Sequence, residues 1–178
     1  MSGGVSLAVW MGGVAREINL LQQASNLRQR QDDTAPGSDP DEKCRELYRQ
    51  LLALLDVTVT TDVLSGTSAG GINAALLGLA GVTGADLGGL RDLWLTTGSM
   101  DMLLRDPGEP NPPSLMQGDK VLFSQLNRGI KDFWDNRSDR FRSPDPVSTS
   151  VFITTTMMTG ETSRFTDDYG TLVLEVNP

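Results

Sequence analysis

Histidine is missing from this sequence altogether, and cysteine and lysine are scarce: the 178 residues include one cysteine and three lysines. A single cysteine, Cys44, cannot form a disulfide within the chain, and zinc sites built from cysteine and histidine are excluded. Phosphate-binding loops and dinucleotide-binding glycine patterns are also absent. We therefore expect no metal and no cofactor, and we expect Cys44 to be a buried apolar side chain on a helix.

Long hydrophobic runs are absent as well. No apolar stretch reaches the ~18–20 residues that a membrane-spanning helix requires. The first residues, MSGGVSLAVWMGGVAREI, contain no basic segment, and glycines interrupt their apolar part. They do not have the pattern of a signal peptide, so the sequence predicts a cytoplasmic protein.

Positively charged residues are fewer than negatively charged ones: the sequence has 15 lysines and arginines and 23 aspartates and glutamates, which gives a net charge of −8. An acidic surface is not attracted to nucleic acid or to anionic lipid, so we expect no nucleic-acid partner. Contact with a membrane surface would have to be hydrophobic, peripheral and transient. With 38% apolar residues, the chain is long enough for one domain with a substantial core.

The first half of the chain is mainly helical in its periodicity. Residues 7–28 predict a helix whose apolar face carries Trp10, Val14, Ile18 and Leu21. The adjacent glycines Gly12 and Gly13 within it indicate that a backbone or a ligand approaches closely. After an acidic loop, Asp39 or Asp41 is expected to cap a second helix. The apolar stripe of that helix consists of Cys44, Leu47, Tyr48, Leu51, Leu52 and Leu55.

A β-branched run, VTVTTDVL at residues 57–64, predicts a strand that ends at Leu64 or Ser65. A helix is expected to begin at Ala69 and to end at Gly81 or Gly84. Two more helices are expected near residues 86–95 and 119–134, with Trp94 and Trp134 in the core. Three strand-like runs follow, within residues 149–160, 161–168 and 171–176. Helices mixed with β-branched strands indicate an α/β layer protein.

The clearest functional pattern lies where the predicted strand meets the helix. Gly66-Thr67-Ser68-Ala69-Gly70 is a G-x-S-x-G sequence, which presents a nucleophilic serine on a sharp turn. Close glycines relieve crowding in such a turn, and the helix that follows directs its N-terminal dipole at the serine oxygen. The alternative is a plain turn in which Ser68 caps the helix.

A glycine pair, Gly3-Gly4, precedes the first predicted helix. Such a pair leaves backbone N–H groups free to bind an oxyanion, although a flexible terminus would have the same sequence.

Without histidine, Ser68 cannot act as it does in α/β-hydrolases, subtilisin-like proteases or malonyl-type acyltransferases, which all place a histidine beside the serine. No Ser-x-x-Lys pair occurs in the sequence either. The base that remains for a serine nucleophile is a carboxylate.

A serine activated by a carboxylate is the arrangement of the patatin-like phospholipases, which this sequence resembles. GTSAGG (residues 66–71) looks like their nucleophile elbow, and SGGVSLAVWMGGVAREINLL is similar to their oxyanion loop and first helix. LRDLWL and SRFTDDYG are similar to a group of large bacterial patatin-related proteins. The resemblance implies a three-layer α/β/α fold with a mainly parallel central sheet. It also implies Ser68 as the nucleophile and an oxyanion hole formed by the backbone N–H groups of Gly3, Gly4 and Val5.

The first of three departures from that family concerns the loop itself. Its usual sequence is G-G-G-x-[RK]-G, whereas this chain has Val5, Leu7 and Ala8 at the third glycine, the basic position and the last glycine. The second departure is that only two residues precede Gly3, although the family's loop follows a strand.

The third departure is the missing base. The family's catalytic aspartate lies in a D-G-[GA] motif, and no Asp-Gly dipeptide occurs in the sequence. Asp119, Asp167 and Asp168 are in turn-like settings without a following glycine, so none of them is assigned as the base. Residues 1–178 are therefore expected to be the N-terminal part of a patatin-like catalytic domain, incomplete at both ends.

The function expected for the intact protein is hydrolysis of lipid acyl esters by a Ser–Asp dyad. A positioned base contributes ~10²–10⁴ in rate, so this chain alone is expected to be weakly active or inactive. The alternative is a non-catalytic module that binds lipid or protein on a patatin scaffold. Acyl transfer to an alcohol other than water is a remoter alternative that would use the same residues.

Overall fold

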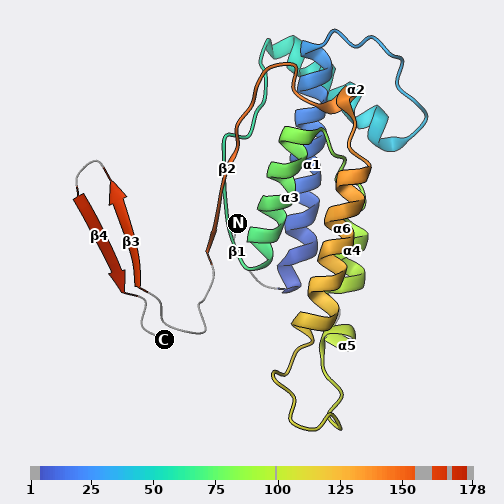
Figure 1. Ribbon diagram of the computed structural model, residues 1–178. Helices are drawn as coiled ribbons and strands as arrows, with labels where there is room; N and C mark the ends of the chain where they lie inside the picture. Colours follow the sequence, from blue (N-terminus) through green and yellow to red (C-terminus); the bar gives the residue numbers. More distant parts are fainter. Residues whose placement is uncertain (1–4, 99, 155–161, 168–169, 176–178) are drawn as a thin grey trace.

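The computed structural model describes residues 5–98, 100–154, 162–167 and 170–175. These residues form a mixture of helices and strands, which confirms the α/β class in its general sense (Figure 1). The strands form a two-stranded parallel sheet and a separate antiparallel hairpin. Most of the core lies between three helices, α1 (Val5–Gln29), α3 (Ala69–Thr83) and α4 (Leu90–Thr97).

Helix α1 forms close to the predicted bounds, but its predicted apolar face is wrong in part: Ile18 packs against the core, whereas two other predicted residues are exposed. Trp10 is 69% exposed and Val14 37% exposed. The buried apolar side chains of α1 are instead Ala8, Met11, Ala15, Leu20, Ala24 and Leu27. Helices α2, α3 and α4 all pack on α1, so small residues line the close contacts and the largest side chains do not mark the core face.

Helix α2 (Pro40–Leu55) begins as predicted, with Asp39 as its N-cap accepting a hydrogen bond from the Asp41 N–H at 3.3 Å. Its predicted stripe is largely on the outside. Leu52 is 3% exposed, whereas Leu47, Leu51 and Leu55 are 66%, 47% and 58% exposed. The helix is rotated because it directs the guanidinium of Arg45, 5% exposed, toward α1.

Cys44 is half-buried, so the expectation of a buried side chain is wrong. Its thiol faces the Glu17 carboxylate, with the sulfur 3.9 Å from Oε1. Partial burial, together with the negative charge of Glu17, raises the pKa of the Cys44 thiol. A thiol with a raised pKa forms little of the reactive thiolate near neutral pH.

The parallel sheet pairs β1 (Val63–Thr67) with β2 (Ser150–Thr154), in a register that places Val63 opposite Ser150 and Thr67 opposite Thr154. The predicted strand over 57–64 is therefore shifted toward the C-terminus. Residues 57–62 are irregular, because the short β2 supplies partners for 63–67 alone. The connection between the two strands contains α3, α4, α5 (Met100–Leu103) and α6 (Phe123–Asp135).

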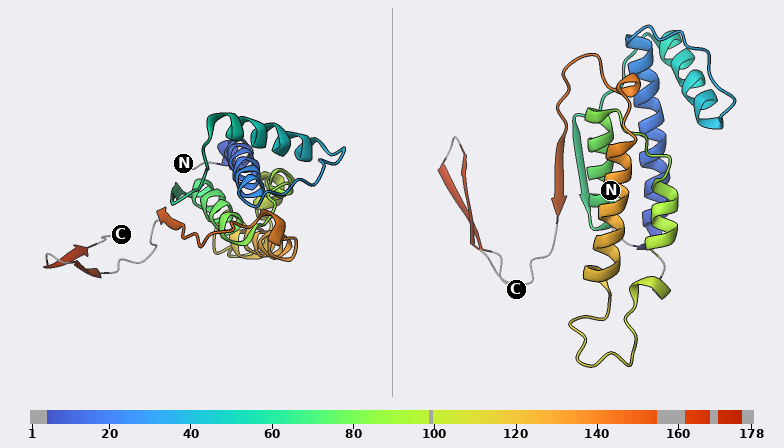
Figure 2. Two further views of the ribbon diagram at one scale, coloured as in Figure 1. Left: turned by 90° about the horizontal axis from the view of Figure 1, so that it is seen from above. Right: turned by 45° about the vertical axis from the view of Figure 1, so that its right-hand side comes forward.

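One face of this sheet packs on α3, and the other carries exposed apolar side chains. On the α3 side, a Cβ added to Gly71 would lie 2.7 Å from Ile153, and one added to Gly78 would lie 2.9 Å from Val151. Away from the α3 side, Val63 is 67% exposed and Phe152 60% exposed. Figure 2 shows β1 and β2 at one side of the helices in both views.

The remaining elements follow the predicted order. Helix α4 buries Trp94, which is 4% exposed, but Trp134 on α6 is 46% exposed, so its predicted place in the core is wrong. The Trp134 ring is covered by the Arg137 guanidinium, 4.6 Å from the ring centroid.

A π-helical turn, η1 (Gly118–Leu122), precedes α6, and a 3-10 turn, η2 (Asp139–Phe141), follows it. The last two predicted strands are confirmed as the antiparallel pair β3 (Thr162–Asp167) and β4 (Gly170–Glu175).

Candidate active site

Ser68 is the single residue between the last residue of β1 and the first residue of α3. Its backbone has φ 54° and ψ −126°, and its side chain makes no capping hydrogen bond to the helix. Positive φ at a residue other than glycine is sparsely populated and costs of order 1–3 kcal/mol. The residue is exposed at the tip of the turn. This is the strand–turn–helix setting of a nucleophile elbow, and it argues against the simple helix cap.

The turn is closed so tightly that glycine is required two residues before the serine. A Cβ added to Gly66 would lie 2.2 Å from the carbonyl oxygen of Gly70 and 2.5 Å from the amide nitrogen of Gly71. Both contacts are with backbone atoms, which cannot move aside. The elbow residues Gly66, Ala69 and Gly70 are buried, while Thr67 is exposed and its hydroxyl lies 2.6 Å from that of Thr154 on β2.

Helix α3 directs its N-terminus at Ser68. The carbonyl oxygen of Ser68 accepts bonds from the N–H groups of Gly71 at 2.9 Å and Ile72 at 3.2 Å, which begin the helix. The N–H of Ala69, the residue after the serine, lies in the first turn, where backbone donors have no acceptor within the helix. Those donors and the helix dipole favour negative charge beside the serine oxygen.

The second part of the expected oxyanion hole is only partly within the described residues. Gly3 and Gly4 lie outside them, and Val5 is the first residue of α1. Helices α1 and α3 begin at the same end of the molecule (Figure 1). Asn73 on α3 donates from Nδ2 to the carbonyl oxygen of Ala8 on α1, at 3.3 Å. The first turn of α1 therefore lies beside the helix that carries the elbow.

No base for Ser68 is found in the part of the chain that the structure describes, where no hydrogen bond joins its hydroxyl to a carboxylate. Asp119 lies in η1, Asp167 is the last residue of β3, and Asp168 falls outside the described residues. In the same part of the chain, no group of three acidic or cysteine side chains is close enough to hold a metal ion.

A buried polar cluster between α1, α2 and the segment before α4 was not predicted. Arg45 donates to Asp86 at 3.2 Å, to Gln23 at 2.9 Å and to Glu42 at 2.8 Å. Arg16 pairs with the other oxygen of Asp86 at 3.0 Å. Burial raises the pKa of Asp86, but the positive charge of Arg16 and several hydrogen bonds outweigh it, and the pKa is lowered overall. The cluster fixes α2 on α1 and is structural in its contacts.

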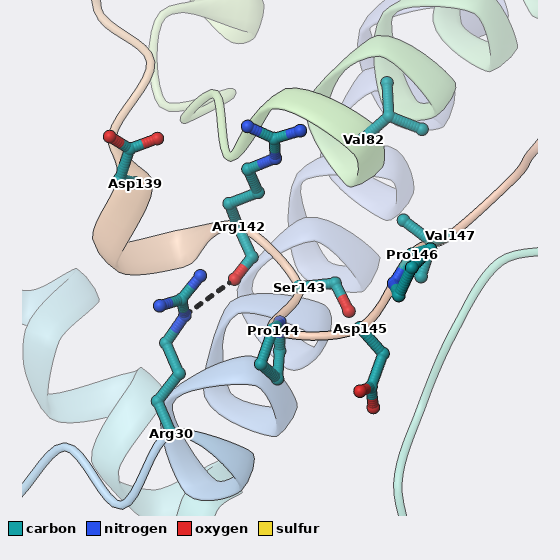
Figure 3. A pocket seen from close by; sticks show the side chains of 9 residues that line it. All are labelled: Arg30, Val82, Asp139, Arg142, Ser143, Pro144, Asp145, Pro146 and Val147. Carbon is teal, nitrogen blue, oxygen red and sulfur yellow. Dashed lines mark hydrogen bonds between the residues drawn. The ribbon is translucent and has the colours of Figure 1, made fainter.

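One hollow lies near the C-terminal end of α3, where Val82 is part of its wall, whereas Ser68 precedes the N-terminal end of that helix (Figure 3). It has a volume of about 630 Å³ and is lined by residues that include Val82, near the end of α3, and Arg30 and Arg142. Arg30 Nε donates to the carbonyl oxygen of Arg142 at 2.9 Å. Asp139 and Asp145 share the wall with the two arginines, so the lining has no excess of either charge. This hollow is not part of the Ser68 site.

None of the helices that the structure describes has the length and hydropathy needed to cross a bilayer. No family model matches the sequence, and no solved structure matches it. The chain is similar to a Mycobacterium tuberculosis protein named "Uncharacterized membrane protein Rv3479". The two sequences are 50% identical over an alignment of 184 residues, and this alignment covers 99% of this chain and 17% of the relative. The chain thus spans about a sixth of the length of that relative.

Proposed function

We propose that Ser68 is the nucleophile of a serine lipid acyl hydrolase, a phospholipase or esterase of the patatin-like type, and that an aspartate outside these 178 residues is its base. The observation that carries the proposal is the conformation of Ser68. A strained, exposed serine with φ 54° and ψ −126° is held between a strand and a helix N-terminus. Such strain persists only where the surrounding structure enforces it, and it is concentrated at functional sites.

The chemistry follows from what surrounds the serine. The Ser68 Oγ attacks the ester carbonyl while a carboxylate accepts its proton, and the carbonyl oxygen becomes an oxyanion. The backbone N–H of Ala69 and those at Gly3, Gly4 and Val5 stabilise that charge, and one such donor is worth ~3 kcal/mol in the transition state. The protonated carboxyl group then gives its proton to the leaving oxygen, and the alcohol departs. Water, which loses a proton to the same carboxylate, hydrolyses the acyl-enzyme and restores the Ser68 hydroxyl.

The absence of histidine is consistent with this scheme, since a Ser–Asp dyad requires none. The chain alone lacks the aspartate and is expected to turn over slowly or not at all. The relative is about six times as long as the segment it shares with this chain, so a longer protein has room for the base.

We also propose that the two-stranded sheet belongs to a larger, mainly parallel sheet in a three-layer α/β/α patatin-like domain. Parallel sheets are normally covered on both faces. Here α3 covers one face, while Phe152 and Val63 are exposed away from it. Further strands and a second helical layer would bury these side chains.

The proposed location is the cytoplasm, with transient hydrophobic contact at a membrane surface where the lipid esters lie. The name of the Mycobacterium tuberculosis relative describes a membrane protein, which favours contact with lipid in the longer protein. Exposed apolar side chains at the Ser68 end, among them Trp10 at 69% and Leu7 at 44%, are suited to such contact.

The second candidate function is a non-catalytic lipid- or protein-binding module on the same scaffold. Two observations favour it: no carboxylate is bonded to Ser68 within the described residues, and Leu7 stands where the family has a basic residue. Turnover separates the two functions, since a binding module has no reason to hydrolyse an ester.

The test is hydrolysis of a short-chain nitrophenyl ester by the complete protein that carries this segment. Ser68→Ala is expected to abolish hydrolysis, because alanine keeps the backbone and removes the nucleophile. Ser124→Ala is the matched control, since Ser124 is an exposed serine on α6, and the activity of this variant should stay near that of the wild type. Unchanged turnover in Ser68→Ala would contradict the proposal.

A further inference from the structure

Asn73 joins three helices close to Ser68. It lies in the second turn of α3 and is fully buried, at 0% exposure. Its Nδ2 donates to the carbonyl oxygen of Ala8 on α1 at 3.3 Å. Its Oδ1 accepts a hydrogen bond from the indole Nε1 of Trp94 on α4 at 2.8 Å. Both polar atoms of one amide side chain therefore connect separate elements.

The indole of Trp94 is itself held against α1. A Cβ added to Gly12 would lie 3.1 Å from Trp94 Cδ1 and 3.5 Å from Leu90 Cγ. Glycine at position 12 lets the indole rest on the α1 backbone, and Trp94 is 4% exposed. The Gly12-Gly13 pair predicted the approach of a backbone or a ligand, and this is corrected: side chains approach Gly12, and a Cβ on Gly13 would meet nothing within 4 Å.

A buried amide side chain at this position requires hydrogen-bond partners that an apolar side chain would not need. Its neighbours along α3, Leu76 and Leu77, are buried apolar side chains, at 2% and 0% exposure. Burying a polar group costs free energy unless it is hydrogen-bonded, and an apolar side chain would pack α3 without that requirement. Unlike an apolar side chain, the amide makes two directional hydrogen bonds. These bonds fix the positions of α1, α3 and α4 along one another, which we call their register.

That register determines where the first turn of α1 lies relative to Ser68. Ala8 closes the first turn of α1, and Asn73 lies about one turn beyond Ser68. Both first turns present backbone N–H groups without acceptors in their own helix. The bond between Asn73 and Ala8 therefore holds two sets of candidate oxyanion donors at a set distance from each other.

We propose that Asn73 is a positioning residue for the Ser68 site and that it acts through Ala8, with Trp94 fixing its orientation. The inference rests on the proposed function of Ser68. Asn73 touches no reacting atom in this scheme. It keeps the first turn of α1 where its N–H groups reach the oxyanion that forms on attack by Ser68.

Loss of this bond should slow the chemical step more than it weakens binding. A displacement of about 1 Å in a catalytic group costs on the order of 100-fold in rate. Asn73→Ala in the complete protein is expected to lower the rate constant of covalent modification of Ser68 by a fluorophosphonate roughly 10- to 100-fold. The probe concentration at half-maximal rate should stay within about twofold, because binding of the probe's alkyl chain does not depend on the oxyanion donors.

Two further variants separate positioning from general stability. Leu77→Ala removes a buried apolar side chain one turn further along the same face of α3 and leaves both hydrogen bonds of Asn73 in place, so it should destabilise the fold while the modification rate stays near that of the wild type. Trp94→Phe keeps most of the ring and removes only the donor to Asn73, so an intermediate loss of rate is expected. Combining it with Asn73→Ala should add little, since both act through one connection.

The inference is overturned if folded Asn73→Ala reacts at the wild-type rate, or if Leu77→Ala is slowed as much as Asn73→Ala. If Asn73→Ala does not fold, Trp94→Phe decides, and a wild-type rate in that variant contradicts the positioning role. A wild-type protein that is not modified at Ser68 contradicts the proposed function itself, and the positioning role falls with it. Labelled wild type with unaffected variants contradicts the positioning role alone.

Discussion

Gly66 and Gly70 face each other across the Ser68 turn so closely that a Cβ on residue 66 would lie 2.2 Å from the carbonyl oxygen of residue 70. One glycine is in strand β1 and the other in the first turn of α3, and their contact holds the serine at positive φ. Glycine at position 66 thus has a direct steric reason. Any larger residue at 66 would push the strand and the helix apart.

The first prediction concerns Gly66→Ala. The added methyl group collides with backbone atoms on the facing helix turn, so we expect a loss of about 3 kcal/mol or more in the free energy of unfolding. Urea denaturation measures it. The matched control is Gly13→Ala, because a Cβ at residue 13 meets nothing within 4 Å. That variant should gain about 0.5–1 kcal/mol from the better helix propensity of alanine. Equal stabilities for the two variants would contradict the steric account.

The second prediction is that Ser68→Gly stabilises the fold. Glycine adopts positive φ without penalty, so relief of the strain at φ 54° should raise the free energy of unfolding by about 1 kcal/mol. Denaturant titration of both proteins measures the difference. Asn127→Gly, at an exposed position within α6 where φ is helical, should instead lower stability by about 0.3 kcal/mol, because glycine has a lower helix propensity than asparagine. A loss of stability in Ser68→Gly would show that the serine conformation is not strained.

The third prediction concerns Arg45, which is 5% exposed and bonds to Asp86, Gln23 and Glu42. Arg45→Ala leaves these acceptors without their donor, and we expect a loss of about 3 kcal/mol. Arg91→Ala is the control, because the Arg91–Asp92 pair has side chains 74% and 79% exposed. It should change stability by less than about 0.5 kcal/mol. Thermal or urea unfolding compares the two, and similar losses would rule out a structural role for the buried cluster.

The fourth prediction is a pH dependence at Asp32. Hydrogen bonds from Thr34, including its N–H at 2.9 Å, and from the Arg140 guanidinium lower the pKa of Asp32 to about 2. Because the pKa of Asp32 in the folded state is lower than the ordinary aspartate value of 3.8, the charged carboxylate stabilises the fold above pH 3.8. The stabilisation is lost as the pH falls through about 2.

Asp32→Asn isolates this contribution. The difference in unfolding free energy between wild type and Asp32→Asn should be constant above about pH 5 and should shrink steadily as the pH falls toward the folded-state pKa of about 2. Urea titrations at several pH values measure it. Asp92→Asn, at an exposed carboxylate that pairs with Arg91, should show a much smaller difference throughout. If the wild type remains more stable than Asp32→Asn below pH 2, or becomes more so, the charged Asp32 carboxylate is not the source of the difference and the prediction is wrong.

The local features of the Ser68 turn were predictable from the sequence. A strand, a G-x-S-x-G run and a helix that ends at Gly84 all depend on residues that are neighbours in the chain. The exact span of the strand was not predictable, because β1 pairs with β2, whose residues follow more than 80 positions later. The β-branched residues 57–62 have strand propensity, but no strand lies beside them in the described residues.

The sequence also did not allow a prediction of which face of each helix is buried. On α2, the inward direction is set by Arg45, whose partners Gln23 and Asp86 come from other elements. A stripe of leucines on the same helix is left exposed as a result. Trp134 resembles Trp94 in its sequence setting, but only Trp94 finds a buried acceptor, Asn73. The role of Asn73 could not be predicted from the sequence, because a single asparagine within a helix is common and does not indicate a particular function.

The most direct measurement for the central claim is the position of a fluorophosphonate adduct on the complete protein, determined by mass spectrometry of its peptides. If Ser68 is an activated nucleophile, the adduct will be on Ser68, and the stabilised but nucleophile-free Ser68→Gly protein will not be labelled. A folded complete protein that remains unlabelled, or that carries the adduct on another residue, would contradict the assignment of Ser68.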